Sequence, residues 1–149
     1  MAIMDAKATF AYEKDVTTTA NTVISGTTVG TDGVITSGGI QVVDLGAAGD
    51  AVGQELTFKA FVGKTAIAAS SGATIQVSIQ TSDAVDSNWH DLLIGPAITV
   101  GATKTIVKGE KLYDGRIPAG SERYLRANVK VGTSATTAGT VNMFLTKDL

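Results

Sequence analysis

A strict alternation of apolar with polar or aromatic residues over 124–131 constrains the fold more than any other feature of the sequence. Successive side chains of a β-strand point to opposite faces, so this pattern predicts a strand with one face on a core and the other toward solvent. The turn sequence PAGS at 118–121 comes shortly before it. The inward set is Leu125, Ala127, Val129 and Val131, and the outward set is Tyr124, Arg126, Asn128 and Lys130.

Short apolar runs separated by glycine-rich turns predict further strands along the chain. Threonine and valine favour pleated surfaces, and many of the 17 glycines fall where turns are needed. We count about eight short antiparallel strands and no convincing helix, which predicts an all-β sandwich or jelly roll. Besides 124–131, the predicted strands are 40–45, 56–62, 74–81, 89–94, 97–100, 104–107 and 140–145, and residues 111–117 lead into 124–131. Shorter pieces are predicted at Val23-Ile24, Val29 and Val34-Ile35, with a hairpin turn at Asp32-Gly33.

The length of 149 residues is typical of one domain with a sizeable core. We expect an extended N-terminal arm over 1–20 and a single β-sandwich over 21–149. Phe10 and Tyr12 alternate within the arm, and the arm is expected to pack these rings on its own core or on a neighbour.

Cysteine is absent, which excludes disulfides and thiolate metal sites. No segment approaches the roughly 18 apolar residues of a membrane span. The first ten residues carry Asp5 and Lys7 where a signal peptide needs an apolar run. We therefore expect a protein made in a host cytoplasm and used without secretion, with no membrane partner.

Charge is distributed unevenly along the chain. Residues 15–58 carry five carboxylates and no cation, whereas 101–131 carry seven cations and three anions. Either these charges pair within the fold, or they form two surfaces of opposite sign that orient partners. The net charge of −2 argues against a general nucleic-acid binder. Our candidate partner-binding residues are Phe10, Tyr12, Arg116, Arg123, Arg126 and Lys130. For the cations among them, the alternative is an ordinary strand face exposed to solvent.

Residues 82–91 hold the few side chains that could carry chemistry. His90 is the only histidine, and without a nucleophile-elbow pattern we expect it to be an ordinary surface or strand-end residue. Trp89 is expected to plug the core, with an exposed sugar-binding platform as the alternative. The spacing of the acidic and amide residues does not match that of a calcium-binding EF-hand loop, and the sequence has no phosphate-binding loop. We therefore expect no metal or cofactor. The acidic and amide groups considered for calcium are Asp83, Asp86, Asn88 and Asp91.

Two groups of motifs resemble the capsid cement (decoration) proteins of the Bordetella-phage type. The first is DLG at 44–46 after a strand, then IQVSIQTSD at 75–83 leading to Trp89. The second is IPAG at 117–120 running into RYLR at 123–126, followed by a Gly-Thr turn and a final strand. Their order and spacing carry the resemblance, since no single motif is catalytic.

The resemblance covers roughly residues 40–148 and, more weakly, 8–10. It implies a jelly roll that sits as an oligomer on the outside of a phage head and clamps neighbouring capsomers, with no catalytic residues to transfer. Residues 21–39 are longer than the family pattern, which leaves an extra hairpin or an arm toward a neighbour as alternatives.

We therefore expect a non-enzymatic cement protein on the outer capsid surface of a virion. Its partners would be the major capsid protein and a second copy of itself, with a homodimer favoured and a homotrimer as the alternative. One alternative is a carbohydrate-binding sandwich, which needs Trp89 exposed in a groove. Another is a small β-fold hydrolase, which needs a nucleophile or an acidic pocket beside His90.

Overall fold

A computed structural model describes residues 9–19, 22–25, 42–46, 56–84 and 87–147. These residues form twelve strands and no helix, which confirms the all-β prediction. The strands are β1 (Thr9–Asp15), β2 (Thr22–Ser25), β3 (Val43–Asp44), β4 (Leu56–Val62), β5 (Ala68–Ala69), β6 (Ala73–Ser82), β7 (His90–Ile94), β8 (Ile98–Val100), β9 (Lys111–Arg116), β10 (Tyr124–Gly132), β11 (Thr136–Ala138) and β12 (Thr140–Lys147).

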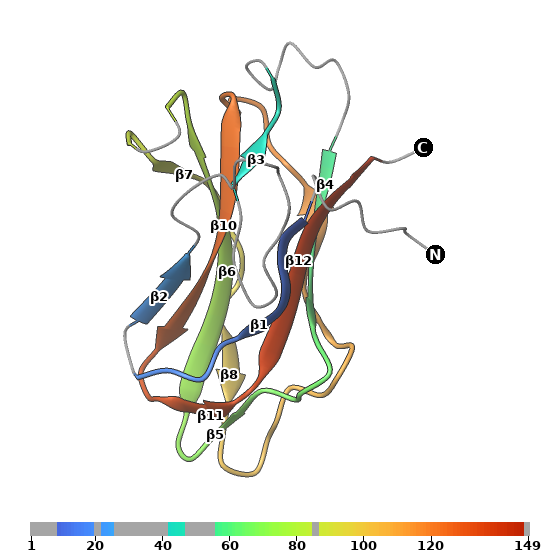
Figure 1. Cartoon of the computed structure of the whole chain (residues 1–149). Helices are drawn as coiled ribbons and strands as arrows, with labels where there is room; N and C mark the ends of the chain where they lie inside the picture. The colour runs from blue at the N-terminus through green and yellow to red at the C-terminus, as the bar shows by residue number, and fades with distance from the viewer. Residues whose placement is uncertain (1–8, 20–21, 26–41, 47–55, 85–86, 148–149) are drawn as a thin grey trace.

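Eight of these strands form two facing antiparallel sheets (Figure 1). The orders are β1-β12-β4-β9 in one sheet and β2-β10-β6-β7 in the other, where β3 also pairs with β10 and β8 with β6. If the eight are renumbered in chain order, the sheets read 1-8-3-6 and 2-7-4-5, which is jelly-roll topology. The short strands β5 and β11 pair with each other. The predicted sandwich of about eight main strands is therefore confirmed.

Side chains from both sheets fill one core. The inward set of β10 is fully buried, as the alternation predicts. From the opposite sheet, Phe10 meets Phe58 edge to face, with ring centroids 5.9 Å apart. Burial of so much aliphatic and aromatic surface is the main stabilisation that a chain without cysteine has available.

Most of the predicted strands match the structure, and one does not exist. The predicted strand 56–62 is β4, and 74–81, 124–131 and 140–145 lie within β6, β10 and β12. The predicted strands 89–94 and 97–100 each begin one residue before β7 and β8, and of 40–45 only 43–44 is strand among the described residues. Residues 104–107 form only isolated bridges, Gly101 with Lys104 and Ile106 with Ile67, because the chain turns tightly there. The predicted pieces at Val29 and 34–35 and the hairpin at 32–33 lie outside the described residues.

The N-terminal arm is corrected for residues 9–15, which are strand β1 of the sandwich. This strand pairs with β12 from Thr9 to Asp15. Phe10 is completely buried in the chain's own core, so the expectation that it serves a partner was wrong. Two register shifts and a positive φ of 49° at Glu13 interrupt the alternation of β1, and for that reason the sequence pattern did not reveal the strand.

Candidate partner-binding surface

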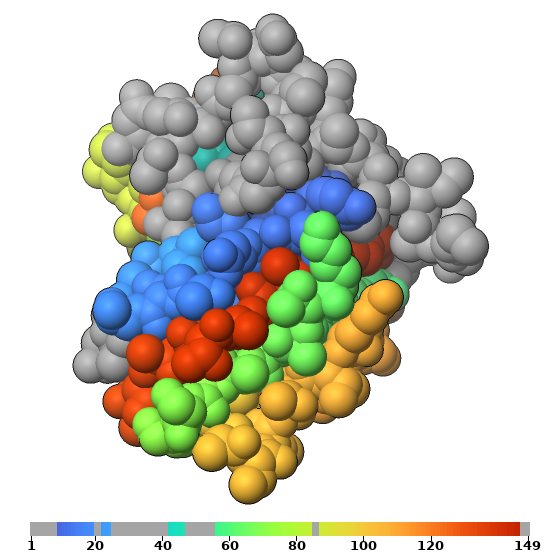
Figure 2. Space-filling view, turned by 60° about the horizontal axis from the view of Figure 1, so that its bottom comes forward, coloured from blue at the N-terminus to red at the C-terminus, as the bar shows by residue number. Residues whose placement is uncertain are grey.

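The six candidate partner-binding residues do not form one cluster. Arg123, Arg126 and Lys130 lie on or beside β10, in the six-stranded sheet. Arg116 is exposed at the end of β9, an edge strand of the opposite sheet. Tyr12 is half exposed on β1, also in that opposite sheet, and Phe10 is buried. Figure 2 shows this second face, on which β1, β12, β4 and β9 run side by side. A partner on one flat face could reach only part of the candidate set.

Arg123 makes a two-pronged ion pair with Asp44. Its Nε and Nη2 atoms each donate a hydrogen bond of 2.9 Å to a different carboxylate oxygen. The Arg123 guanidinium, with help from the Gly46 N–H, holds the pKa of Asp44 below its usual value. The same guanidinium lies 5.1 Å from the centre of the Tyr124 ring. This ion pair joins the acidic part of the sequence to the basic part within one chain. It is an instance of the first of the two charge alternatives, in which the charges pair within the fold.

Arg126 stacks on Trp89, outside the core. The guanidinium carbon lies 4.5 Å from the ring centroid, and Nε donates a 2.8 Å hydrogen bond to Gln80 Oε1. Gln80 in turn donates to Asp91 Oδ1 at 3.0 Å. Partial burial lowers the pKa of Arg126. The prediction that Trp89 plugs the core was wrong, because Phe10, Phe58 and aliphatic side chains fill the core and the indole is only half-buried beneath the guanidinium.

These contacts define a region that we call the Arg–Trp surface. Arginine, tryptophan and tyrosine are the residues most enriched at the centres of protein–protein interfaces. Here their side chains are already held by neighbours, which reduces the entropy that binding would cost. The Arg–Trp surface consists of Asp44, Gln80, Trp89, Arg123, Tyr124 and Arg126.

The sequence indicated the arginines but not their partners. Gln80 belongs to the outward set of the predicted strand 74–81, which was a usable signal. Its position opposite Arg126, however, depends on the register between β6 and β10, strands that lie more than forty residues apart in sequence. The pairing of Asp44 with Arg123 depends in the same way on β3 joining β10.

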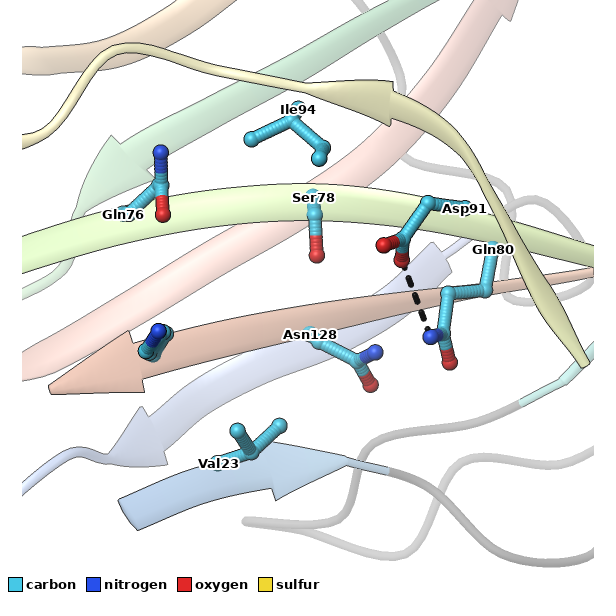
Figure 3. Close-up of a pocket in the computed structure, with 8 residues that line it drawn as sticks. Val23, Gln76, Ser78, Gln80, Asp91, Ile94 and Asn128 are labelled. Atoms are coloured by element: carbon cyan, nitrogen blue, oxygen red, sulfur yellow. Dashed lines mark hydrogen bonds between the residues drawn. The ribbon is translucent and has the colours of Figure 1, made fainter. Parts of the chain in front are cut away.

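A groove crosses the outer face of the same sheet (Figure 3). It has a volume of about 270 Å³ and extends over β2, β10, β6 and β7. Lys130 belongs to this groove rather than to the Arg–Trp surface. The groove is lined by Val23, Gln76, Ser78, Gln80, Asp91, Ile94, Asn128 and Lys130.

His90 is exposed at the first position of β7, as expected for a strand-end residue. Its Nδ1 atom lies 3.2 Å from the carbonyl oxygen of Asn88. The nearby Ser82 is fully buried, and its hydroxyl donates to the Ser87 carbonyl. The nucleophile that the hydrolase alternative needs is therefore not supplied by Ser82.

Three of the four residues considered for calcium, Asp83, Asn88 and Asp91, form hydrogen bonds with one another or with neighbours. Asp83 accepts a hydrogen bond of 3.4 Å from Asn88, and Asp91 accepts from Gln80. Asp86 lies outside the described residues. Within the described ranges, no three metal-ligating side chains come together, and no helix could span a membrane.

The fold and the surface together define a cysteine-free jelly-roll domain with an aromatic and arginine-rich patch on one outer face. The chain matches the model of the Bbp16 family over residues 24–145. It therefore belongs to the Bbp16 family, a family of Bordetella phage proteins. A comparison with the curated proteins finds no match.

Proposed function

We propose that the chain is a non-enzymatic capsid decoration protein, which binds the outer surface of a phage head and stabilises contacts between capsomers. The observation that carries this proposal is the family match over residues 24–145, which makes the chain a member of a phage protein family. The jelly-roll topology agrees with what the resemblance to cement proteins implies for the fold. Under this proposal the protein is a component of the virion.

Within the proposal, the Arg–Trp surface is the contact with the major capsid protein. Its indole, phenol and guanidinium groups offer large contact area with few rotatable bonds left to immobilise. Arg116, on the opposite sheet, would then face away from the capsid or toward a second copy.

The protein is also proposed to associate with itself, as a homodimer or alternatively a homotrimer. Strands β1 and β9 end the four-stranded sheet, and each has one side without a strand partner among the described residues. Such edges pair readily with another chain unless they are covered. Tyr12 adds an exposed ring to the β1 edge.

Binding to purified heads that lack this protein tests the capsid contact. We expect Trp89→Ala and Arg126→Ala each to weaken binding about 10-fold or more, since truncation of a central aromatic or arginine residue typically costs more than 1 kcal/mol. Arg116→Ala is the matched control, an exposed arginine on the other sheet, and should bind like the wild type. Thermal melts of each variant exclude unfolding as the cause.

Two outcomes would overturn parts of this proposal. If the wild-type protein does not bind heads at all, the decoration function is wrong. If Arg116→Ala weakens binding while Trp89→Ala and Arg126→Ala do not, the four-stranded sheet is the capsid-facing side and the Arg–Trp surface is not.

A further inference from the structure

The groove on the six-stranded sheet contains a buried polar atom that nothing in the described chain satisfies. Asn128 lies on β10, directly opposite Ser78 of β6. It is only 4% exposed, and its Oδ1 atom has no hydrogen-bond partner. Figure 3 shows its amide standing on the groove floor between β2 and β6. A buried oxygen without a hydrogen bond destabilises a fold. Its presence in a groove points to a ligand that donates the missing hydrogen bond.

Most of the other residues that line the groove are polar, and their charges balance. Gln76 and Ser78 add an amide and a hydroxyl from β6. Gln76 uses its Nε2 atom to donate a 2.8 Å hydrogen bond to the Gly95 carbonyl, which fixes the direction of its amide. One carboxylate, Asp91, and one ammonium, Lys130, contribute opposite charges. This balance favours a neutral ligand over an anion or a cation.

Two aliphatic side chains flank this polar floor. Val23 on β2 and Ile94 on β7 stand on opposite sides of the groove in Figure 3. They are 53% and 58% exposed, which makes them two of the most exposed large apolar side chains among the described residues. They offer apolar contact to a ligand that presents C–H groups as well as hydrogen-bonding groups.

A peptide strand is a poor occupant for this groove. Extended peptides gain affinity by adding main-chain hydrogen bonds to a sheet edge. The floor strands β10 and β6 each already have strand neighbours on both sides, so their main-chain groups are used in the ladders. Recognition here must come from side chains, which suits a small ligand rich in hydroxyl groups.

We propose that this groove binds a neutral saccharide. A sugar hydroxyl donates to Asn128 Oδ1, and because a hydroxyl both donates and accepts, neighbouring hydroxyls can bond Ser78 and the Gln76 amide. The ring C–H groups contact Val23 and Ile94. The volume of about 270 Å³ lies near the lower end of ligand pockets, about 300–1,000 Å³, and suits one or two sugar rings. This activity is additional to capsid binding and uses no exposed face of Trp89.

Nuclear magnetic resonance of the intact, isotope-labelled protein tests the proposal directly. The probes are glucose, galactose, mannose, N-acetylglucosamine and rhamnose, each titrated separately. We expect at least one sugar to shift the side-chain amide signals of Asn128 and Gln76 in a saturable way. The signal of Asn142, an amide on the opposite sheet, should stay in place and serves as the internal control.

Asn128→Leu separates ligand binding from folding. Leucine has the same branched arrangement of heavy atoms as asparagine and removes the unpaired oxygen, so the variant should melt at a higher temperature and lose the sugar response. Ser78→Val provides a second variant that removes a groove hydroxyl, and it should weaken the response. Thr99→Val, an exposed position on β8 outside the groove, should leave the response unchanged.

The proposal is wrong if none of the five sugars gives a saturable shift, or if Asn128→Leu responds as the wild type does. It is also wrong if the groove signals respond to phage heads and not to sugars, because the groove would then be part of the capsid contact. Capsid binding is measured separately on phage heads. A negative sugar titration therefore does not contradict the decoration function, and a failure to bind heads does not contradict the saccharide site.

Discussion

At the scale of single residues, neighbouring positions on β10 have opposite roles. Leu125 is completely buried between the sheets, while Arg126 lies on the outer face against Trp89. The sequence alternation predicted both directions correctly. It did not predict that Asn128, also in the outward set, would be almost fully covered by its neighbours.

Leu125→Ala should lower the free energy of unfolding by about 2–5 kcal/mol, the usual cost of a cavity in a packed core. Ile94→Ala is the matched control, since this aliphatic residue is 58% exposed and its truncation should cost about 0.5 kcal/mol or less. Denaturant melts of the two variants measure the difference. Equal costs would mean that the inner face of β10 is not the packed face.

At the scale of strands, Glu13 ties β1 to its surroundings. Its carboxylate accepts hydrogen bonds from the Lys64 N–H at 2.9 Å, Thr140 Oγ1 at 2.8 Å and Asn142 Nδ2 at 3.0 Å. The Glu13 N–H donates back to Asn142 Oδ1 at 2.6 Å. A Cβ atom at Gly63 would lie 2.6 Å from both carboxylate oxygens, so a larger residue there would displace the Glu13 side chain from this network. This network holds the bulged part of β1 against β12 and the end of β4.

The network makes stability depend on pH. Burial alone would raise the pKa of Glu13, but the hydrogen bonds from Lys64, Asn142 and Thr140 outweigh it and lower the pKa. A lowered pKa contributes stability above the unfolded-state pKa, and that contribution is lost as the pH falls through the folded-state value. Glu13→Gln should therefore cost about 1–2 kcal/mol at neutral pH and progressively less below about pH 4.

Melts of Glu13→Gln and the wild type across this pH range check the expectation. Leu125→Ala is the control, because it removes no titratable group and its cost should stay constant with pH. A Glu13→Gln penalty that is the same at pH 3 and pH 7 would show that the charge of this carboxylate does not matter to the fold.

The strands that the sequence predicted well are the regular ones. In β4, β6 and β10, alternation continues over seven or more residues, so the inward face is evident from the sequence. Strand β1 is bulged, and β5 and β11 have only two and three residues, too short for any periodicity. The sequence around 104–107 has the composition of a strand, but the chain turns at 102–103, so Lys104 bridges back to Gly101 and only Ile106 bridges to another part of the chain.

At the scale of the whole molecule, the two sheets present outer faces of different character. The six-stranded sheet carries the Arg–Trp surface and the polar groove. On the four-stranded sheet, Phe61 and Phe144 stack with ring centroids 6.1 Å apart, and Lys59 and Lys111 both approach Asp114. The sequence indicated which residue types gather near β10. It could not assign them to faces, since that depends on which distant strands become neighbours.

Heat treatment of phage heads with and without this protein tests the decoration function most directly. A protein that binds the assembled head better than the disrupted one shifts the equilibrium toward the assembled state. We therefore expect the protein to copurify with wild-type heads, and heads made without it to release their genome at a lower temperature, with the difference restored when purified protein is added back. Equal heat tolerance of the two kinds of head, with no protein bound to either, would contradict the account.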